Sequence, residues 1–448
     1  MIFSNNESKF KFSIPLIWLL FIIYGSFIPF RIRSISLIDA LYQFKHIPFL
    51  DLEITSRSDW VANILLYTPL GFFLLGWISK KANSFYKKGL AFFTVFLFCI
   101  LTATSVEFFQ IFISPRTVSL NDLIAETLGS LFGILLWFFS GPKIINLWFS
   151  AKSNSRAEVA LNAFFFLYVV SLLGITLFPF DFLVSAQEMK WKYEAWKMQS
   201  FLLNVNVSTV FIIKTMVEAA IFTPIGGLIG LKFRHTNVKI VLFLTILASF
   251  SIGFLIELLQ FFTASGVSQG FSVLVRISGA FIGLAIVKSS FLNYWEWFRP
   301  YVRYLILMIF PIYFVLILKL SGWSKNGWLT IHESFSTFDF HMLLPFYFHY
   351  FSTETRAVLS LLLNFGIYIP VGFSCWLVYF SNNGYKKRYI VVSVFISMVL
   401  SLFTETGKLF QKGLHPDFTN VLIAAVSAFI VFKLSDRLFS VLYDVFNE

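Results

Sequence analysis

The chain contains very little charge for its length. Only 13% of its 448 residues are charged, whereas 58% are hydrophobic and 60 are Phe. A typical soluble domain has about 25% charged residues. The scarcity of charge therefore excludes an ordinary soluble globular protein and indicates a membrane protein.

Cysteine and the common catalytic motifs are also scarce or missing. The two cysteines, Cys99 and Cys375, lie inside apolar runs, which excludes a disulfide framework or a cysteine metal cluster. The sequence has no G-x-S-x-G elbow, P-loop or G-x-G-x-x-G loop. Asp339, His341 and His349 match no established set of metal ligands. We therefore expect no metal and no cofactor, and we assign no catalytic residue.

Twelve apolar runs have the length of membrane spans. A helix needs roughly 17–25 apolar residues to cross a bilayer. No small-residue cleavage site follows the first run, which indicates a retained helix rather than a signal peptide. The fold class is therefore all-α, a polytopic membrane protein of about 12 transmembrane helices. The expected spans are approximately 13–30, 60–78, 90–111, 122–140, 159–180, 208–231, 240–262, 272–287, 304–320, 357–380, 390–410 and 418–432.

Lys and Arg are divided unevenly between the two sets of loops. If the N-terminus is inside, the inner segments hold 20 Lys and Arg and 6 acids in 90 residues. The outer segments hold 11 Lys and Arg and 11 acids in 118 residues. This excess predicts cytoplasmic N- and C-termini. The basic loops then face anionic membrane lipids, and nucleic acid is not an expected partner, because no soluble domain carries a basic patch with aromatics.

One pattern of polar and small residues occurs three times. A polar residue precedes a Pro by six positions, and a Gly follows that Pro by two, in the sets Asn63, Pro69, Gly71; Glu218, Pro224, Gly226; and Asn364, Pro370, Gly372. The next helix ends in a glutamate followed three residues later by Gln or Lys, as Glu107 and Gln110, Glu257 and Gln260, and Glu405 and Lys408. The helix after that opens with Asp122, Ser272 or Asp417 and carries the small pairs Gly129/Gly133, Gly279/Gly283 and Ala424/Ala428.

Four features in the same order, three times, predict three repeats of four helices each. The expected boundaries are 1–150, 151–295 and 296–448. Because four is an even number, every repeat begins and ends on the same side of the membrane. The repeats are therefore parallel rather than inverted.

Polar residues inside the apolar runs are the candidate functional residues. An ionised side chain in mid-membrane costs about 2.5–3.5 kcal/mol, so such groups pair, face the bundle interior or lie near span ends. The predicted topology brings them to the outer side, where they either bind a ligand or lock helices together. We predict pairing of Lys214 with Glu218, and of Glu126 with Arg276 across a repeat interface. The candidate cluster is Asn63, Glu107, Gln110, Arg116, Asp122, Glu126, Glu218, Glu257, Gln260, Arg276, Asn364, Glu405 and Asp417.

The repeated prolines and small residues are better explained by architecture than by chemistry. Pro69, Pro224 and Pro370 fall within predicted helices, where each removes a backbone donor and kinks the helix. The Gly two positions after each Pro, Gly71, Gly226 or Gly372, permits close approach by a neighbouring helix. The small pairs at four-residue spacing likewise predict close helix packing.

At these residues the chain resembles the VanZ-like family of bacterial membrane proteins. The family pattern has Asn before Pro-Leu-Gly-Phe, then Glu-x-x-Gln, then Arg and Asp ahead of a Gly-x3-Gly helix. The first repeat is most similar, through Asn63, Pro69-Leu70-Gly71-Phe72, Glu107, Gln110, Arg116, Asp122, Gly129 and Gly133. Where the family usually has Asn, four residues after the Asp, the three repeats have Glu126, Arg276 and Val421. The second and third repeats are the more divergent copies.

The resemblance implies a multi-pass protein of the bacterial cytoplasmic (inner) membrane with a role in the cell envelope. The family is named for a protein linked to resistance against the lipoglycopeptide antibiotic teicoplanin. The leading hypothesis is an envelope protein that binds an amphipathic lipid, glycolipid or lipoglycopeptide-type ligand at the outer face, linked to envelope stress or antibiotic resistance.

Two other classes of function stay open. A multi-pass transporter is the second hypothesis, since acids within the membrane can carry protons, although three repeats differ from the usual two halves. A lipid- or glycan-modifying enzyme using Glu107 or Asp122 as acid or base ranks last, because no nucleophile–base pair can be recognised. The sequence leaves the oligomeric state open.

Overall fold

We analysed a computed structural model that describes residues 13–50, 54–79, 84–152, 157–198, 209–289, 295–323, 327–336, 338–382 and 385–447. The chain forms two compact units, Met1–Lys288 and Ser289–Glu448. The first compact unit spans the first two predicted repeats, and the second spans the third. The division into three repeats remains a proposal, which the recurring contacts described below support.

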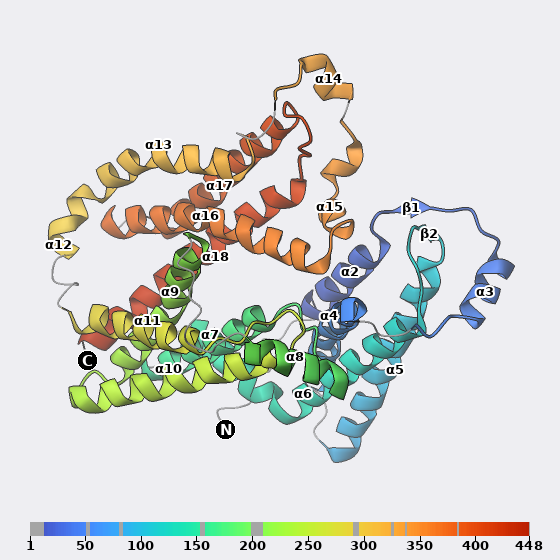
Figure 1. Ribbon diagram of the computed structural model, residues 1–448, viewed down its shortest axis with the longest axis horizontal. Coiled ribbons are helices and arrows are strands. Elements are labelled where there is room, and N and C mark those ends of the chain that lie inside the picture. Colours follow the sequence, from blue (N-terminus) through green and yellow to red (C-terminus); the bar gives the residue numbers. More distant parts are fainter. Residues whose placement is uncertain are drawn as a thin grey trace. The chain divides into compact units, whose positions relative to one another are not determined.

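Long helices make up most of both compact units (Figure 1). The first contains α2 (Ser13–Phe27), α4 (Ile54–Ile78), α5 (Phe85–Gln110), α6 (Leu120–Lys152), α7 (Ala157–Leu177), α9 (Thr209–Lys232), α10 (Val238–Phe261) and α11 (Gly270–Lys288). The second contains α13 (Val302–Leu320), α16 (Glu354–Asn382), α17 (Lys386–Lys408) and α18 (Phe418–Asn447). Each of the twelve predicted spans falls on one of these helices.

Shorter elements lie in the connections between the long helices. In the first compact unit they are α3 (Leu37–Lys45), α8 (Ala186–Met198) and the strands β1 (Arg31–Ile32) and β2 (Ile113–Ser114), which pair antiparallel. In the second they are α12 (Trp295–Phe298), η3 (Arg299–Tyr301), α14 (Ile331–Ser336), η4 (Phe340–Leu343) and α15 (Tyr347–Tyr350).

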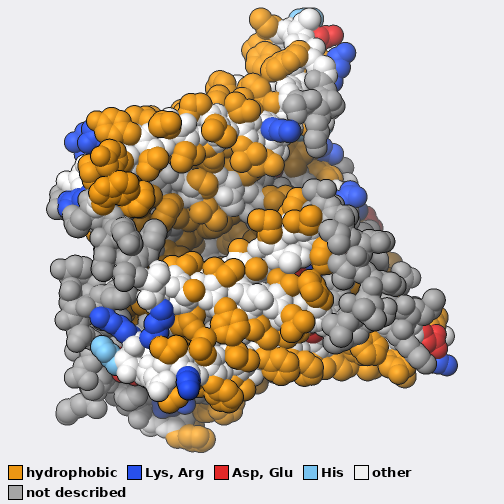
Figure 2. Space-filling model, turned by 60° about the vertical axis from the view of Figure 1, so that its left-hand side comes forward, with side chains coloured by type: hydrophobic (Ala, Val, Ile, Leu, Met, Phe, Trp, Pro, Cys, Tyr) orange, Lys and Arg blue, Asp and Glu red, His pale blue; other side chains and the backbone are white. Residues whose placement is uncertain are grey.

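The helices are those of a membrane protein. Within the described residues, eleven helices are long and apolar enough to cross a membrane, and α2 is a shorter apolar helix. A span in lipid must satisfy its own backbone hydrogen bonds, which is why these apolar runs are helical. Large apolar side chains stay exposed on them, as at Met308 in α13, which is 74% exposed. On the face in Figure 2, apolar side chains cover much of the described surface. The predicted all-α polytopic fold is confirmed.

The second and fourth helices of each repeat are in close contact. α4 packs most extensively on α6, α9 on α11, and α16 on α18. A Cβ added to Gly133 would lie 1.9 Å from the carbonyl oxygen of Thr68, and one added to Gly283 would lie 1.8 Å from that of Thr223. These helices therefore approach backbone to backbone, as the small residues predicted. In the third repeat the predicted correspondence of Ala424 and Ala428 is wrong by three residues. The Ser427 hydroxyl donates to the carbonyl of Phe365 at 2.7 Å, five residues before Pro370, which is the place that Gly129 and Gly279 occupy beside the carbonyls of Ile64 and Ala219.

An aromatic donor from the first helix of each repeat binds the proline-containing second helix. Trp18 Nε1 donates to the carbonyl of Leu66 at 2.8 Å, and the Tyr313 hydroxyl donates to that of Ile367 at 2.7 Å. The Tyr168 hydroxyl donates to the carbonyl of Ile221. Each accepting carbonyl lies three residues before the helical Pro69, Pro370 or Pro224. Proline interrupts the helical hydrogen-bond ladder, and the aromatic donor supplies a partner beside the interruption.

A glutamine side chain ties the third helix of each repeat to the end of the first. The Nε2 atoms of Gln110, Gln260 and Gln411 donate to the carbonyls of Ser26, Thr176 and Trp323 at 3.2, 3.1 and 2.8 Å. The backbone pairs at the same place, through β1 and β2 in the first repeat and through single bridges Phe182–Thr263 and Trp328–Gln411 in the others. Carbonyls at a helix C-terminus otherwise lack partners, so these contacts close the ends of α2, α7 and α13.

We expect Gly133→Ala to lower the free energy of unfolding by about 1–3 kcal/mol, because the added Cβ would overlap the Thr68 carbonyl. Thermal unfolding of the purified chain in detergent measures this. Gly174→Ala in α7 is the matched control, since its Cβ would meet nothing within 4 Å and alanine is the better helix former. Equal loss of stability in both variants would contradict backbone contact between α4 and α6.

Candidate functional site

In the first repeat the candidate site begins where α6 starts. Ser119 precedes α6 and caps it, accepting a hydrogen bond from the Asp122 N–H at 3.2 Å. Its hydroxyl in turn donates to Asp122 Oδ2 at 2.5 Å. Asn63 Nδ2, from α4, donates to Asp122 Oδ1 at 2.8 Å. The structure therefore brings Asn63 and Asp122 together and leaves the carboxylate half-buried at the helix N-terminus.

Two further carboxyl groups lie beneath Asp122. Glu107 of α5 is 2% exposed and Glu126 of α6 is 3% exposed. Both are close enough to Asp122, and to each other, to interact electrostatically. The Oε2 atom of each has no hydrogen-bond partner among the described residues. The first repeat thus gathers three acidic side chains, of which two are deeply buried.

Tyr67 lies next to the buried carboxyl groups of this cluster. It lies two residues before Pro69 in α4, is fully buried, and lies near Glu107 and Glu126. Within the described part of the chain its hydroxyl has no hydrogen-bond partner of good geometry. Sequence reasoning missed Tyr67 because a tyrosine in an apolar helix resembles an ordinary core residue.

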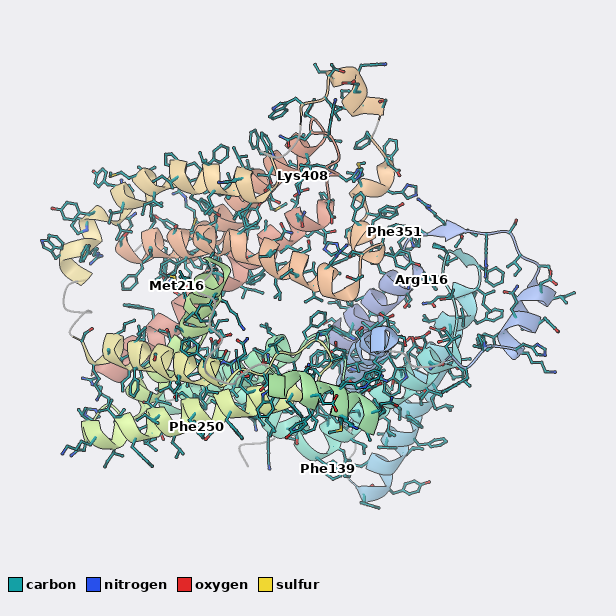
Figure 3. All side chains as sticks on the ribbon, in the orientation of Figure 1. Arg116, Phe139, Met216, Phe250, Phe351 and Lys408 are labelled. Atoms are coloured by element: carbon teal, nitrogen blue, oxygen red, sulfur yellow. The ribbon has the colours of Figure 1, made fainter. Side chains whose placement is uncertain are left out.

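Arg116 holds the loop between α5 and α6 to the end of α2 (Figure 3). Its Nε donates to the carbonyl of Ile28 at 2.9 Å and its Nη2 to that of Gly25 at 2.7 Å. It also attracts Glu107 electrostatically. The guanidinium of Arg116 therefore lies close to one of the three carboxyl groups, that of Glu107.

The second repeat is balanced by its own cations. Arg276 of α11 lies 2.8 Å from Glu257 Oε1 and 3.9 Å from Glu218 Oε2. Its Nη1 also donates to the carbonyl of Gly253 at 3.0 Å. The predicted pair of Lys214 with Glu218 forms, at 3.7 Å.

The predicted pairing of Glu126 with Arg276 is wrong. Arg276 is satisfied inside its own repeat, because Glu257 and Glu218 reach it from the neighbouring helices α10 and α9. A cavity of about 200 Å³ adjoins this network, and its lining includes Lys214, Glu218, Glu257, Gln260, Ser272 and Arg276.

The third repeat also neutralises its buried glutamate. Glu405 accepts hydrogen bonds from Lys408 Nζ at 2.6 Å and from Asn420 Nδ2 at 2.9 Å. Asp417 lies 3.3 Å from His349 Nδ1. Asn364 was predicted to belong to this group. Instead, its amide donates to the carbonyl of Ser360, one turn earlier in α16.

The repeated glutamate has a fixed relation to the fourth helix. The residue twelve positions later, Ser119, Gln269 or Asp417, immediately precedes α6, α11 or α18. In the second and third repeats its backbone N–H donates to the glutamate, from Gln269 to Glu257 and from Asp417 to Glu405 at 2.9 Å. The carboxylate thereby caps the next helix. In the first repeat Ser119 and Asp122 make the cap between them, which leaves Glu107 without this bond.

The comparisons with known proteins identify the family of the first repeat. Residues 11–141 match the family model described as VanZ/LLP1. This segment is VanZ-like. The matched range contains α2, α4, α5 and most of α6, and with them the carboxyl cluster of the first repeat. No curated protein and no solved structure matched the chain.

Two residues of the third repeat were not predicted from the sequence. Gln411 makes the contact that Gln110 and Gln260 make, although it lies six rather than three residues after its glutamate. His349 matched no set of metal ligands in the sequence, but in the structure it lies 3.3 Å from Asp417. Burial lowers the pKa of its imidazole, and the negative charge of Asp417 opposes that effect. The sequence pattern places this Gln three residues after the glutamate, and in the third repeat Lys408 occupies that position.

An ion pair joins the first two repeats. Arg57 makes two hydrogen bonds of 2.9 Å to the Glu188 carboxylate of α8, and a third of 3.1 Å to the carbonyl of Phe182. The hydrogen bonds from Arg57, helped by the N–H groups of Val184 and Ser185, lower the pKa of Glu188 to about 2. Segment 186–197, which contains Trp191 and Trp196, is therefore helical, and its first turn is held to α4 by the Arg57–Glu188 pair.

We expect Arg276→Met to destabilise the protein by about 3–5 kcal/mol, because it leaves Glu257 buried without its cation. Adding Glu257→Gln should recover most of the loss, as measured by thermal unfolding in detergent. Lys214→Met is the control, because its half-exposed pair is worth about 0–1 kcal/mol. Full stability of Arg276→Met alone would refute the pairing.

The Arg57–Glu188 pair predicts an acid-dependent loss of stability. A carboxylate with a depressed pKa stabilises the folded state above its ordinary pKa of about 4.3 and loses that effect as pH falls toward the folded value. We expect wild type to exceed Glu188→Gln in thermal midpoint at pH 6, with a difference that shrinks from about pH 5 to 2. Glu194→Gln, exposed on the same helix, is the control. A pH-independent difference would contradict the prediction.

Proposed function

We propose that the protein is a cell-envelope protein that binds an amphipathic lipid, glycolipid or lipoglycopeptide-type ligand at the outer face of the membrane. The observation that carries this proposal is an apolar groove beside the polar cluster of the first repeat. The VanZ/LLP1 match of that same repeat supports an envelope role.

The groove lies between α2 and α5 and has a volume of about 440 Å³. Its lining is mostly aliphatic and aromatic, with two hydroxyl groups: Leu19, Ile23, Phe27, Phe98, Leu101, Thr102, Ser105, Val106 and Phe109. The hydroxyl of Ser105 is committed to the Leu101 carbonyl at 2.7 Å, and that of Thr102 to Phe98 at 2.9 Å. The groove thus presents little hydrogen-bonding capacity, which suits an acyl chain.

The groove and the polar cluster lie on adjacent sides of one helix. Val106 lines the groove and the next residue, Glu107, belongs to the cluster. Successive helical residues are separated by about 100°. At the end of the groove Phe27 is followed by Ile28, whose carbonyl accepts from Arg116. A ligand with its chain in the groove would bring its polar end to Arg116 and Asp122.

The predicted orientation supports binding from outside. The loop that carries Arg116 belongs to the set of loops poor in Lys and Arg, which marks it as outer. The resemblance to a family linked with teicoplanin resistance favours ligands of the envelope, and an effect on envelope stress or on susceptibility to such antibiotics follows.

Lipid retention tests the proposal. We expect Ser105→Phe to fill the groove and reduce the amphipathic lipid that copurifies with the protein, by about tenfold if overfilling costs about 1.4 kcal/mol. Mass spectrometry of extracted lipid per mole of protein provides the measurement. Teicoplanin susceptibility of cells expressing each variant gives the envelope readout.

Ser278→Phe is the matched control. Ser278 is also an exposed helical serine, and it donates to the carbonyl one turn earlier, at 3.0 Å, but it lies in α11 away from the groove. Equal lipid content in wild type, Ser105→Phe and Ser278→Phe would count against the proposed site.

A further inference from the structure

The repeated buried glutamate meets a cationic nitrogen in two of the three repeats. Glu257 lies 2.8 Å from Arg276 Nη1, and Glu405 lies 2.6 Å from Lys408 Nζ. All four side chains are largely buried, none more than 14% exposed. A buried carboxylate is costly without such a partner.

The two cations come from different positions in the repeat. Arg276 stands four residues after the start of the fourth-helix motif, where the first repeat has Glu126. Lys408 stands three residues after its glutamate, where the first repeat has Gln110. Positive charge therefore reaches the repeated glutamate from different sequence positions in the two repeats. This indicates that the buried glutamate requires a cationic partner, whichever position supplies it.

The first repeat has neither cation. Gln110 is committed to the Ser26 carbonyl, and Glu126 adds a further acid where the second repeat has its arginine. Glu107, Asp122 and Glu126 interact with one another, and Arg116, which also serves two carbonyls of the α2 end, attracts Glu107. If all are ionised, two negative charges remain in excess.

Unused acceptors point into this cluster. Glu107 Oε2 and Glu126 Oε2 lack hydrogen-bond partners among the described residues, and each side chain is more than nine-tenths buried. The buried Tyr67 hydroxyl lies beside Glu126. Above them Asp122 is half-buried and offers an entry from the loop side. These are the groups that an N–H donor with a positive charge would satisfy.

We propose that the first repeat completes the recurring pairing of its buried glutamate with a ligand, by binding a protonated amine or guanidinium group between Glu107, Asp122 and Glu126. The inference deepens the proposed function, on which it rests, by defining the polar end of the ligand as cationic. No set of three or more Asp, Glu, His or Cys side chains in the described ranges has the geometry to hold a metal ion. A hydrogen-bonding nitrogen is therefore the ligand class that fits.

Hexylammonium chloride is a suitable probe, because it joins a protonated amine to a short apolar chain. Hexanol has the same chain without the charge, and potassium chloride supplies a monovalent ion without the N–H donors. A ligand that binds only the folded state raises the thermal midpoint with concentration. We expect the purified full chain to be stabilised by hexylammonium more strongly than by hexanol or potassium chloride at equal concentration.

Three variants test the assignment. Glu126→Arg reproduces the arrangement of Arg276 and should abolish stabilisation by hexylammonium. Glu126→Gln keeps the side-chain shape in case that variant does not fold, and should weaken the apparent affinity at least about tenfold. Glu194→Gln, on an exposed face of α8, should leave binding unchanged.

Equal stabilisation by hexylammonium and hexanol would overturn the cationic assignment and leave the amphipathic groove intact. Stabilisation by potassium equal to that by hexylammonium would overturn it in favour of an inorganic ion. Binding unaffected by Glu126→Gln would overturn the location. The lipid retention of Ser105→Phe is measured without an amine, so failure of the proposed function is recognised separately.

Discussion

A carboxylate buried among apolar helices must be met by positive charge, by hydrogen-bond donors or by a proton, and this constraint organises all three repeats. The free-energy cost of desolvating an unpaired, ionised carboxylate would exceed the free energy of unfolding of most proteins. The second repeat meets it with an arginine and a backbone N–H, and the third with a lysine, an asparagine and a backbone N–H. The first repeat retains acids that its own residues leave only partly satisfied.

The helix packing makes this concentration of acids possible. Glycines on α6 and α11 allow the fourth helix to touch the backbone of the second, so the side chains beside that contact are closely packed. The aromatic donors of the first helix then hold the proline-containing segment from its other side. The carboxyl cluster of the first repeat and the close helix packing thus belong to one arrangement, near the end of α5.

The sequence predicted the helices and the location of polar groups better than their pairings. Apolar length, the helical prolines and the Gly-x3-Gly pairs are local signals, and each has its expected place in the structure. Pairings depend on rotamers and on which helix supplies the partner, so Arg276 joined Glu257 rather than Glu126, and Asn364 turned to its own helix. Tyr67 and Gln411 escaped notice because one resembles core and the other is displaced by one helical turn.

The twelve-residue interval from each buried glutamate to the cap of the fourth helix constrains how such chains can change in length. Insertion or deletion between α10 and α11, or between α17 and α18, would separate the carboxylate from the N–H it receives at Gln269 or Asp417. The connection from the first to the second helix holds α3, α8 or α14. In the first and third repeats this connection also bonds to the start of the fourth helix, through Leu50 and Asn121 and through Phe346 and Thr419. The start of the fourth helix is therefore held from two connections, and a change of length close to either contact would disturb it.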